Sequence, residues 1–192
     1  DICSVGAVFN TPPARNGPST AKCFVYVSPD AQRTMCTYLG ASILLEPEDL
    51  DLSMVENSKV LYLEGYLWDN DSAKKAFINA ADIARTSQCE VALSLSDPFC
   101  VDRHRASFQK LINGYIDILF CNEEEIKSLY QSDTLNEAIE MLRNKCNIAI
   151  ITLGGKGSIV IKGNNLFNIK AYNLGPTIDT TGAGDLYAGG FL

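Results

Sequence analysis

The feature that most constrains the fold is a regular alternation of short apolar runs with helical patterns, which extends over most of the chain. Runs of apolar, often β-branched residues predict strands at 59–64, 91–95, 115–121, 147–153, 158–162 and 166–171. Helical patterns predict helices at 47–58, 71–86, 101–113, 123–130 and 134–145. This alternation indicates an α/β domain whose parallel sheet is covered on both faces, with right-handed crossovers.

The first forty residues are β-rich and differ from the remainder. Residues 3–9 are expected to form a strand, and the Pro-, Asn- and Gly-rich residues 10–19 to form a loop. Two β-branched or aromatic runs, 21–28 and 33–39, flank a turn-forming segment at 29–32. This arrangement is typical of a hairpin.

Size and charge exclude several classes of function. The 192 residues suit one α/β domain. A net charge of −7 without a basic stripe argues against broad binding to nucleic acid or to a membrane surface, and no apolar run reaches membrane-spanning length. We therefore expect neither nucleic acid nor membrane as a partner. A small anionic ligand stays compatible with this charge, because backbone dipoles can outweigh net charge at one site.

The seven cysteines do not form a metal-binding pattern. None belongs to a Cys-x-x-Cys pair and His104 is the single histidine, so the spacing of zinc sites is absent. An odd number of cysteines fits reduced thiols, and we therefore expect a cytoplasmic protein. Each cysteine is expected to be a small buried apolar residue. His104 lies between two arginines, which indicates a solvated helix surface.

Residues 179–185, Asp-Thr-Thr-Gly-Ala-Gly-Asp, carry the clearest chemical signal. They precede an apolar run, which predicts a loop that leads into a helix. The first amides of a helix lack partners, so an anion can approach the turn at 182–184, where the side chains are small. Asp185 would lie beside that anion and could accept a proton from an attacking hydroxyl group. The alternative is an ordinary helix start, capped by Thr181, in which Asp185 interacts with the helix dipole.

Several further polar residues or glycines directly follow predicted strands, at the edge where open parallel sheets bind ligands. They are Glu64, Asp97, Asn122 and Gly154. Asn122 and Glu125 have the spacing of a helix capping box, and at the mouth of the sheet they could also hold Mg²⁺ through water. The segment 152–157 can be either a turn that cradles a planar or phosphorylated ligand or a plain β-turn. It does not match the phosphate-binding loop motif that starts a helix with Gly-Lys-Ser/Thr.

Together, these segments resemble the ribokinase-like, or PfkB, family of carbohydrate and nucleoside kinases. Residues 179–185 are similar to that family's second signature, Asp-Thr-x-Gly-Ala-Gly-Asp. Asn122-x-x-Glu125 and Thr152-x-Gly154-x-x-Gly157 match two further family motifs in the expected order. The resemblance covers nearly the whole chain. It implies a three-layer αβα, Rossmann-like ribokinase fold with a mostly parallel central sheet and a small β lid.

The resemblance also implies ATP-dependent phosphotransfer to an alcohol, with a role for each matched residue. Asp185 would be the base, and an anion hole would be formed by the amides of Gly182, Ala183 and Gly184. The ATP side would consist of Asn122, Thr152, Gly154 and Gly157. The implied cation ligands are Glu125, which with Asn122 would organise Mg²⁺, and Asp179 and Thr181, which resemble the ligands of a monovalent cation such as K⁺ in some members.

Two residues on the substrate side follow from the same resemblance. Glu64 resembles the acid that contacts sugar hydroxyls in ribokinase, and its alternative role is a solvated carboxylate at a strand end. Arg33 resembles an arginine that adenosine kinases place near the substrate, and its alternative is an exposed hairpin residue. Residues 29–40 look closer to the adenosine-kinase branch than to ribokinase.

The expected organisation is one ribokinase-like domain, 1–192, with a β-rich lid and substrate-side segment at 1–40 and an α/β core at 41–192. The family's N-terminal Gly-Gly signature and its C-terminal adenine-contacting segment are missing from these residues, so we expect a domain truncated at both ends. The expected partner is a sugar or nucleoside, and a homodimer through the lid is kept open. Two alternatives remain: a fructokinase or sugar-phosphate kinase of the same family, and a non-catalytic nucleotide-binding or dimerising module.

Overall fold

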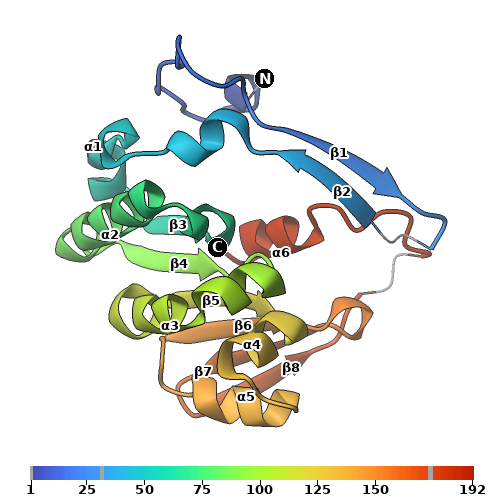
Figure 1. Ribbon diagram of the computed structural model, residues 1–192. Helices are drawn as coiled ribbons and strands as arrows, with labels where there is room; N and C mark the ends of the chain where they lie inside the picture. Colours follow the sequence, from blue (N-terminus) through green and yellow to red (C-terminus); the bar gives the residue numbers. More distant parts are fainter. Residues whose placement is uncertain (1, 31–32, 173–174) are drawn as a thin grey trace.

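The computed structural model describes residues 2–30, 33–172 and 175–192, and its centre is a six-stranded sheet (Figure 1). The strands lie side by side in chain order: β3 (Val60–Glu64), β4 (Glu90–Ser94), β5 (Ile118–Asn122), β6 (Ile148–Thr152), β7 (Ser158–Lys162) and β8 (Asn165–Ile169). β3 to β6 are parallel, and β7 and β8 extend the sheet by antiparallel pairing. The mostly parallel sheet expected from the alternating pattern is confirmed.

Helices cover both faces of this sheet, as Figure 1 shows. One face packs against α2 (Asp71–Thr86), α3 (Pro98–Tyr115), α4 (Glu123–Tyr130) and α5 (Leu135–Leu142), and the other against α6 (Ala183–Phe191). Leu93 and Leu119 point into the first core beside Phe108, whereas Phe120, next along β5, packs with Ala188 of α6. This alternation of side chains produces the predicted three-layer αβα arrangement. Among the described residues, no helix combines the length and the apolar character needed to cross a lipid bilayer.

The predicted hairpin is present as a separate two-stranded sheet. β1 (Lys22–Val27) and β2 (Arg33–Tyr38) pair antiparallel, with Val27 opposite Arg33, and every residue of both strands is exposed. Figure 1 shows the hairpin extending toward the loop that precedes α6. Three cysteines are exposed, Cys3 and the hairpin residues Cys23 and Cys36, and Cys146 is half-buried, which corrects the expectation that each cysteine is buried. Cys89, Cys100 and Cys121 are buried as expected.

The strand predicted at residues 3–9 is wrong. Ile2–Val5 form a 3₁₀ helix, η1, and Gly6 then turns the chain at a φ of +88°. Residues 2–10 are exposed, and no strand of the described residues pairs with them. An apolar run becomes a strand only where a neighbouring strand accepts and donates its backbone hydrogen bonds, and that condition is not met here.

Two aspartate caps shift the helix boundaries. The single helix predicted at 47–58 is divided into a 3₁₀ helix, η3 (Pro47–Asp49), and α1 (Leu52–Glu56), because the Asp51 carboxylate accepts a hydrogen bond from the Met54 amide at 3.3 Å and starts a new helix. α3 begins at Pro98 instead of residue 101, because the Asp97 carboxylate accepts hydrogen bonds from the amides of Phe99 and Cys100 at 2.7 and 3.2 Å. Because α3 extends to Tyr115, β5 begins at Ile118 instead of at the predicted residue 115.

Candidate active site

Glu64 and Asp185 line one cavity of about 430 Å³ at the carboxyl end of the sheet. Glu64 is the last residue of β3, and Asp185 lies in the first turn of α6. Tyr62 and Tyr66 also line the cavity. The fold therefore brings together two acids that come from separate sequence motifs, one expected to contact the substrate and one expected to act as a base.

The start of α6 holds Asp185 at the rim of this cavity. Gly182 is the N-cap residue and has a φ of +73°, a left-handed conformation that suits glycine. A Cβ atom at this position would lie 3.8 Å from Oδ2 of Asp185, so the carboxylate and the cap are neighbours. The alternative in which Thr181 caps the helix is not what the structure shows. Asp185 itself is exposed.

The amides of the Gly-Ala-Gly turn are not equally available. The Ala183 amide donates to the Thr180 carbonyl at 3.1 Å, so this member of the expected anion hole already has a partner. The Gly184 amide lies in the first turn of α6, where no earlier helical carbonyl can accept from it. The positive end of the helix therefore presents fewer bare donors than the sequence indicates.

Burial and neighbouring charges control the ionisation of the cavity. Burial raises the pKa of Glu64, a hydrogen bond from Ser96 opposes this rise, and the charge of Asp185 adds to it. Burial also raises the pKa of Tyr62 to about 12, and the charge of Glu64 contributes next. A cavity with two carboxylates accepts hydrogen bonds, so it suits a ligand that carries hydroxyl groups.

Asn122 and Glu125 form the expected capping box at the start of α4. The backbone amide of Asn122 donates to Oε2 of Glu125 at 2.9 Å, its side-chain amide donates to Oε1 at 2.7 Å, and the Glu125 amide donates to Oδ1 of Asn122 at 2.8 Å. Glu125 is 5% exposed, and burial raises its pKa to about 7 against the lowering effect of the Asn122 amide.

This arrangement does not favour Glu125 as a direct Mg²⁺ ligand, because the carboxylate is buried, both of its oxygens accept hydrogen bonds from Asn122, and it is not among the residues that line the neighbouring cavity. A contact between Glu125 and Mg²⁺ through a water molecule fits better. Asn122 lines a cavity of about 540 Å³ together with Glu123, Glu124 and Thr152, and Mg²⁺ in proteins usually keeps several of its waters.

The segment from Thr152 to Gly157 connects β6 and β7 through a 3₁₀ helix, η5 (Gly154–Lys156). Thr152 and Gly154 line the same cavity as Asn122. Gly157 has a φ of +106°, and a Cβ atom there would lie 1.9 Å from the Ile169 carbonyl oxygen. The packing of the turn against the end of β8 therefore explains this glycine without a ligand.

Asp179 and Thr181 lie together, as a shared cation site requires. The amide and the hydroxyl group of Thr181 donate to Oδ1 of Asp179 at 2.8 and 2.7 Å. These bonds lower the pKa of Asp179, and the charge of Arg33 contributes to the lowering. Arg33 therefore acts on the loop before α6. Asp179 lines a further cavity of about 690 Å³. The expected site residues that line cavities are thus divided among three of them: Glu64 and Asp185 in the first, Asn122, Thr152 and Gly154 in the second, and Asp179 in the third.

The sequence does not single out two residues next to Glu64, namely Tyr62, which lines the cavity, and Ser96, which lies behind it. Ser96, which bonds to Glu64, directly follows the predicted strand 91–95, where the sequence pattern points to its neighbour Asp97. For Tyr62, the apolar run predicts only a place in a strand. Alternation from Glu64 places the two side chains on the same face of β3, which is a signal that could have identified Tyr62.

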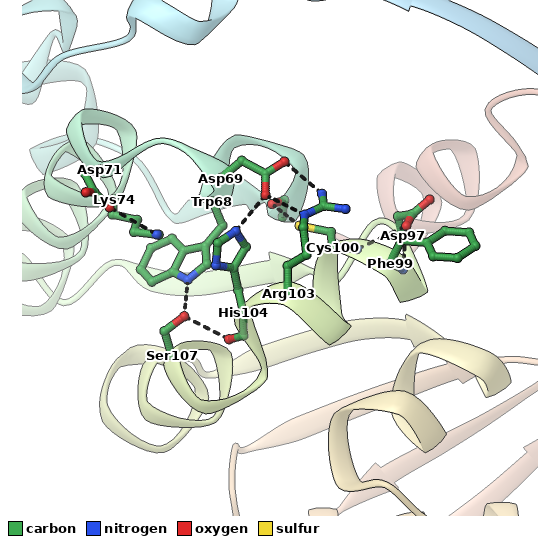
Figure 2. A network of polar contacts seen from close by, with 11 residues as sticks. Trp68, Asp69, Asp71, Lys74, Asp97, Phe99, Cys100, Arg103, His104 and Ser107 are labelled. Atoms are coloured by element: carbon green, nitrogen blue, oxygen red, sulfur yellow. Dashed lines mark hydrogen bonds and ion pairs between the residues drawn. The ribbon is translucent and has the colours of Figure 1, made fainter.

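A polar network ties η4 (Gly65–Asp69), the 3₁₀ helix after Glu64, to α3 (Figure 2). Asp69 accepts hydrogen bonds from Nε and Nη2 of Arg103 at 3.1 and 2.8 Å and pairs with Nε2 of His104 at 2.6 Å. The His104 side chain is 19% exposed, which corrects the expectation of a solvated histidine. Trp68 is buried and donates to the Ser107 hydroxyl at 2.8 Å. These contacts anchor the segment that carries the cavity wall.

Comparisons with known proteins agree with this geometry. The adenosine kinase of Saccharomyces cerevisiae is 25% identical over 192 residues, which span 93% of this chain and 55% of that relative. A solved structure of adenosine kinase from Sinorhizobium meliloti is 43% identical, with a TM-score of 0.95 over 98% of this chain and 58% of that one. A probable sugar kinase from Rhizobium etli CFN 42 is 42% identical, with a TM-score of 0.96 over 100% of this chain and 58% of that one.

The chain thus spans little more than half the length of these similar proteins. It shares the fold of the two solved structures throughout the stretch that it covers. The family model described as pfkB family carbohydrate kinase matches residues 13–192, which include all three of the motifs discussed above. The chain belongs to the PfkB family of carbohydrate kinases.

Proposed function

We propose that the intact protein transfers a phosphoryl group from ATP to an alcohol group of a sugar or nucleoside. The observation that carries this proposal is the shared cavity of Glu64 and Asp185, beside the Gly-Ala-Gly start of α6. Membership of the PfkB family and the likeness to an adenosine kinase and a sugar kinase support it. A non-catalytic nucleotide-binding module would not require two acids in one cavity.

In the proposed reaction, Asp185 accepts the proton of the acceptor hydroxyl while that oxygen forms a bond to the γ-phosphorus of ATP. The bond from the γ-phosphorus to the bridging oxygen breaks, and ADP leaves. Proton transfer of this kind contributes about 10²–10⁴-fold to the rate. The exposed position of Asp185 at the cavity rim allows it to reach a bound alcohol.

The start of α6 would stabilise the negative charge of the transferred group. The amides of Gly182 and Gly184 and the helix dipole supply this interaction, and each preorganised donor is worth roughly 3–4 kcal/mol. The Ala183 amide can bind the transferred group only if it breaks its hydrogen bond to the Thr180 carbonyl oxygen, which is 3.1 Å long.

We assign the ATP side to the cavity beside β5 and β6. Asn122, Thr152 and Gly154 line it, Glu125 fixes the orientation of Asn122, and Gly157 sets the turn. Mg²⁺ would neutralise charge on the phosphates when bound, and Asn122 would contact its waters.

Asp179 and Thr181 would hold a monovalent cation such as K⁺, because a carboxylate and a hydroxyl oxygen lie side by side at this turn. This turn leads directly into α6, so a cation bound there would hold in place the loop that precedes the proposed anion hole.

We divide the chain by role into a lid and substrate-side segment at 1–40 and a core at 41–192. The exposed hairpin extends toward the loop before α6, where the charge of Arg33 acts on Asp179 (Figure 1). A closed lid would exclude the water that otherwise competes for the phosphoryl group. A homodimer through this hairpin is a second proposal, for which the mass in sedimentation is the test. The odd number of cysteines supports the cytoplasm as the compartment.

A substrate panel tests the proposal and its alternatives. The intact protein is incubated with ATP labelled at the γ-phosphate and with adenosine, ribose, fructose or fructose phosphates, and the labelled products are separated. We expect adenosine to be the preferred acceptor. Preference for fructose or a sugar phosphate would favour the sugar-kinase alternative. Saturable ATP binding without a labelled product from any alcohol would favour the non-catalytic module and reject the proposed function.

A further inference from the structure

Ser96 has an unusual backbone conformation in the turn that follows β4. Its φ is +68°, in the left-handed region, and the other non-glycine residues with a positive φ in the described part of the chain are Gln88, Gln131 and Asn144. Serine is not favoured in this conformation, so the surrounding structure must hold it there. The contacts of its hydroxyl group indicate why.

The Ser96 hydroxyl group connects the end of β4 with the cavity wall after β3. It donates to Oε1 of Glu64 and accepts a hydrogen bond from the Tyr66 amide at 3.2 Å. The two turns are also in close backbone contact, since a Cβ atom on Gly65 would lie 2.7 Å from the Ser94 carbonyl oxygen and 2.8 Å from that of Leu95. The left-handed turn therefore aims the hydroxyl group at the carboxylate of Glu64.

Ser96 is absent from the residues that line the cavity, whereas Glu64, Tyr66 and Asp185 all line it. Its effect on a bound ligand must therefore pass through a lining residue that it contacts, which is either Glu64 or the backbone of Tyr66. Of these two contacts, only the one to Glu64 involves a charged side chain. One oxygen of that carboxylate is held by Ser96, which leaves the remaining lone pairs for hydroxyl groups of a ligand. A hydrogen bond to the charged form also opposes protonation of a carboxylate that is partly buried beside a second acid.

We propose that Ser96 is a positioning residue for the acceptor, which fixes the orientation and the charge of Glu64. This inference rests on the proposed function, in which Glu64 contacts the alcohol substrate. According to this inference, the turn after β4 contributes to binding of the acceptor and does not contribute to binding of ATP.

The first test removes the hydroxyl group without straining the backbone. Ser96→Gly does so, because glycine adopts a positive φ freely. Asn144→Gly is the matched control, since Asn144 has a φ of +61° and lies before β6, at the opposite end of the sheet. For Ser96→Gly in the intact protein, we expect the KM for the alcohol to rise by up to about tenfold, because Glu64 loses the hydrogen bond that orients its charged group toward the acceptor. The kcat and the KM for ATP should stay within about twofold, and Asn144→Gly should change none of them. An unchanged alcohol KM in Ser96→Gly overturns the inference.

A double-variant cycle shows whether Ser96 acts through Glu64. In a Glu64→Ala background, which removes the acceptor of the Ser96 hydroxyl group, the further change Ser96→Gly should leave the alcohol KM where Glu64→Ala alone puts it. Independent, multiplicative effects of the two changes would contradict the inference.

A readout without catalysis keeps this inference separate from the proposed function. Absence of turnover by the wild-type protein with every alcohol would reject the function but not the bond between Ser96 and Glu64. Titration of the Glu64 carboxyl carbon by NMR should then show a higher pKa in Ser96→Gly than in the wild-type protein, because the hydrogen bond from Ser96 that opposes the rise is lost. The other ionisable groups that interact with Glu64, which are Tyr62, Tyr66, Asp185 and Glu125, are the same in both proteins. An unchanged Glu64 pKa would overturn the inference.

Discussion

The glycine turn after β6 allows a graded prediction of stability, because three glycines there have different surroundings. Gly155 has an ordinary φ and open space around a Cβ atom, Gly154 has a φ of +57° and open space, and Gly157 has a φ of +106° and a backbone oxygen 1.9 Å from the Cβ position. Replacement by alanine should therefore leave stability nearly unchanged at Gly155. At Gly154, replacement should lower the free energy of unfolding by about 1–2 kcal/mol, because alanine is strained in the left-handed conformation.

At Gly157, strain of about 1–3 kcal/mol is joined by a steric clash that only movement of the chain between β8 and the turn can relieve. The Cβ atom would also lie 2.7 Å from the Ala171 amide, so no small shift satisfies both contacts. We expect Gly157→Ala to lower the free energy of unfolding by about 3 kcal/mol or more. For a domain of roughly 150–250 residues this corresponds to a fall in Tm of about 6–12 °C, and the fall is smaller in a longer intact protein.

Urea denaturation and calorimetry of the three alanine variants of the intact protein measure this series. The order of destabilisation should be Gly157, Gly154 and Gly155. If Gly157→Ala is as stable as Gly155→Ala, the packing of the turn against β8 is not the reason for this glycine. The role of Gly157 in shaping the ATP side would then need another explanation.

Two further predictions concern caps and ionisation. Because burial raises the pKa of Glu125 from 4.5 to about 7, the folded state binds the proton more tightly than the unfolded state. The resulting stability is present below about pH 4.5 and is lost as the pH rises to about 7, by an amount on the order of 3 kcal/mol. Glu125→Gln should flatten this part of the pH profile in urea denaturation, and an unaltered slope would contradict the assigned cause. Asp97→Ala removes the cap of α3 and should cost about 1 kcal/mol in the same assay, whereas an unchanged midpoint would show that the cap contributes nothing.

Much of the core could be predicted from the sequence because local patterns and tertiary packing agree there. The helices at 71–86 and 123–130 have the predicted boundaries, since Asn70 and Asn122 cap them directly. The strand predicted at 3–9 failed because sequence alone does not show whether a neighbouring strand is present to pair with it. Polar residues at the ends of predicted strands indicate the edge of the sheet that binds ligands, and this pattern predicts Glu64 as a site residue.

The site could be predicted only by motif and not by its contacts. The sequence indicates that Asp185 opens a helix, but the bond from Ala183 to Thr180 depends on the path of the loop. It suggests Glu125 as a metal ligand, whereas burial and the bonds to Asn122 decide that the carboxylate is enclosed. Ser96 carries no motif, and its link to Glu64 arises only when β3 and β4 lie side by side.

The most direct test of the central claim is the Asp185→Asn variant of the intact protein. The substitution keeps size and hydrogen bonding at the rim of the cavity but removes the proton acceptor. The dissociation constant for ATP, measured by calorimetry, should stay within about threefold of the wild-type value, while kcat with the preferred alcohol falls by about 10²–10⁴-fold. Near-normal turnover by Asp185→Asn would show that this carboxylate is not the base.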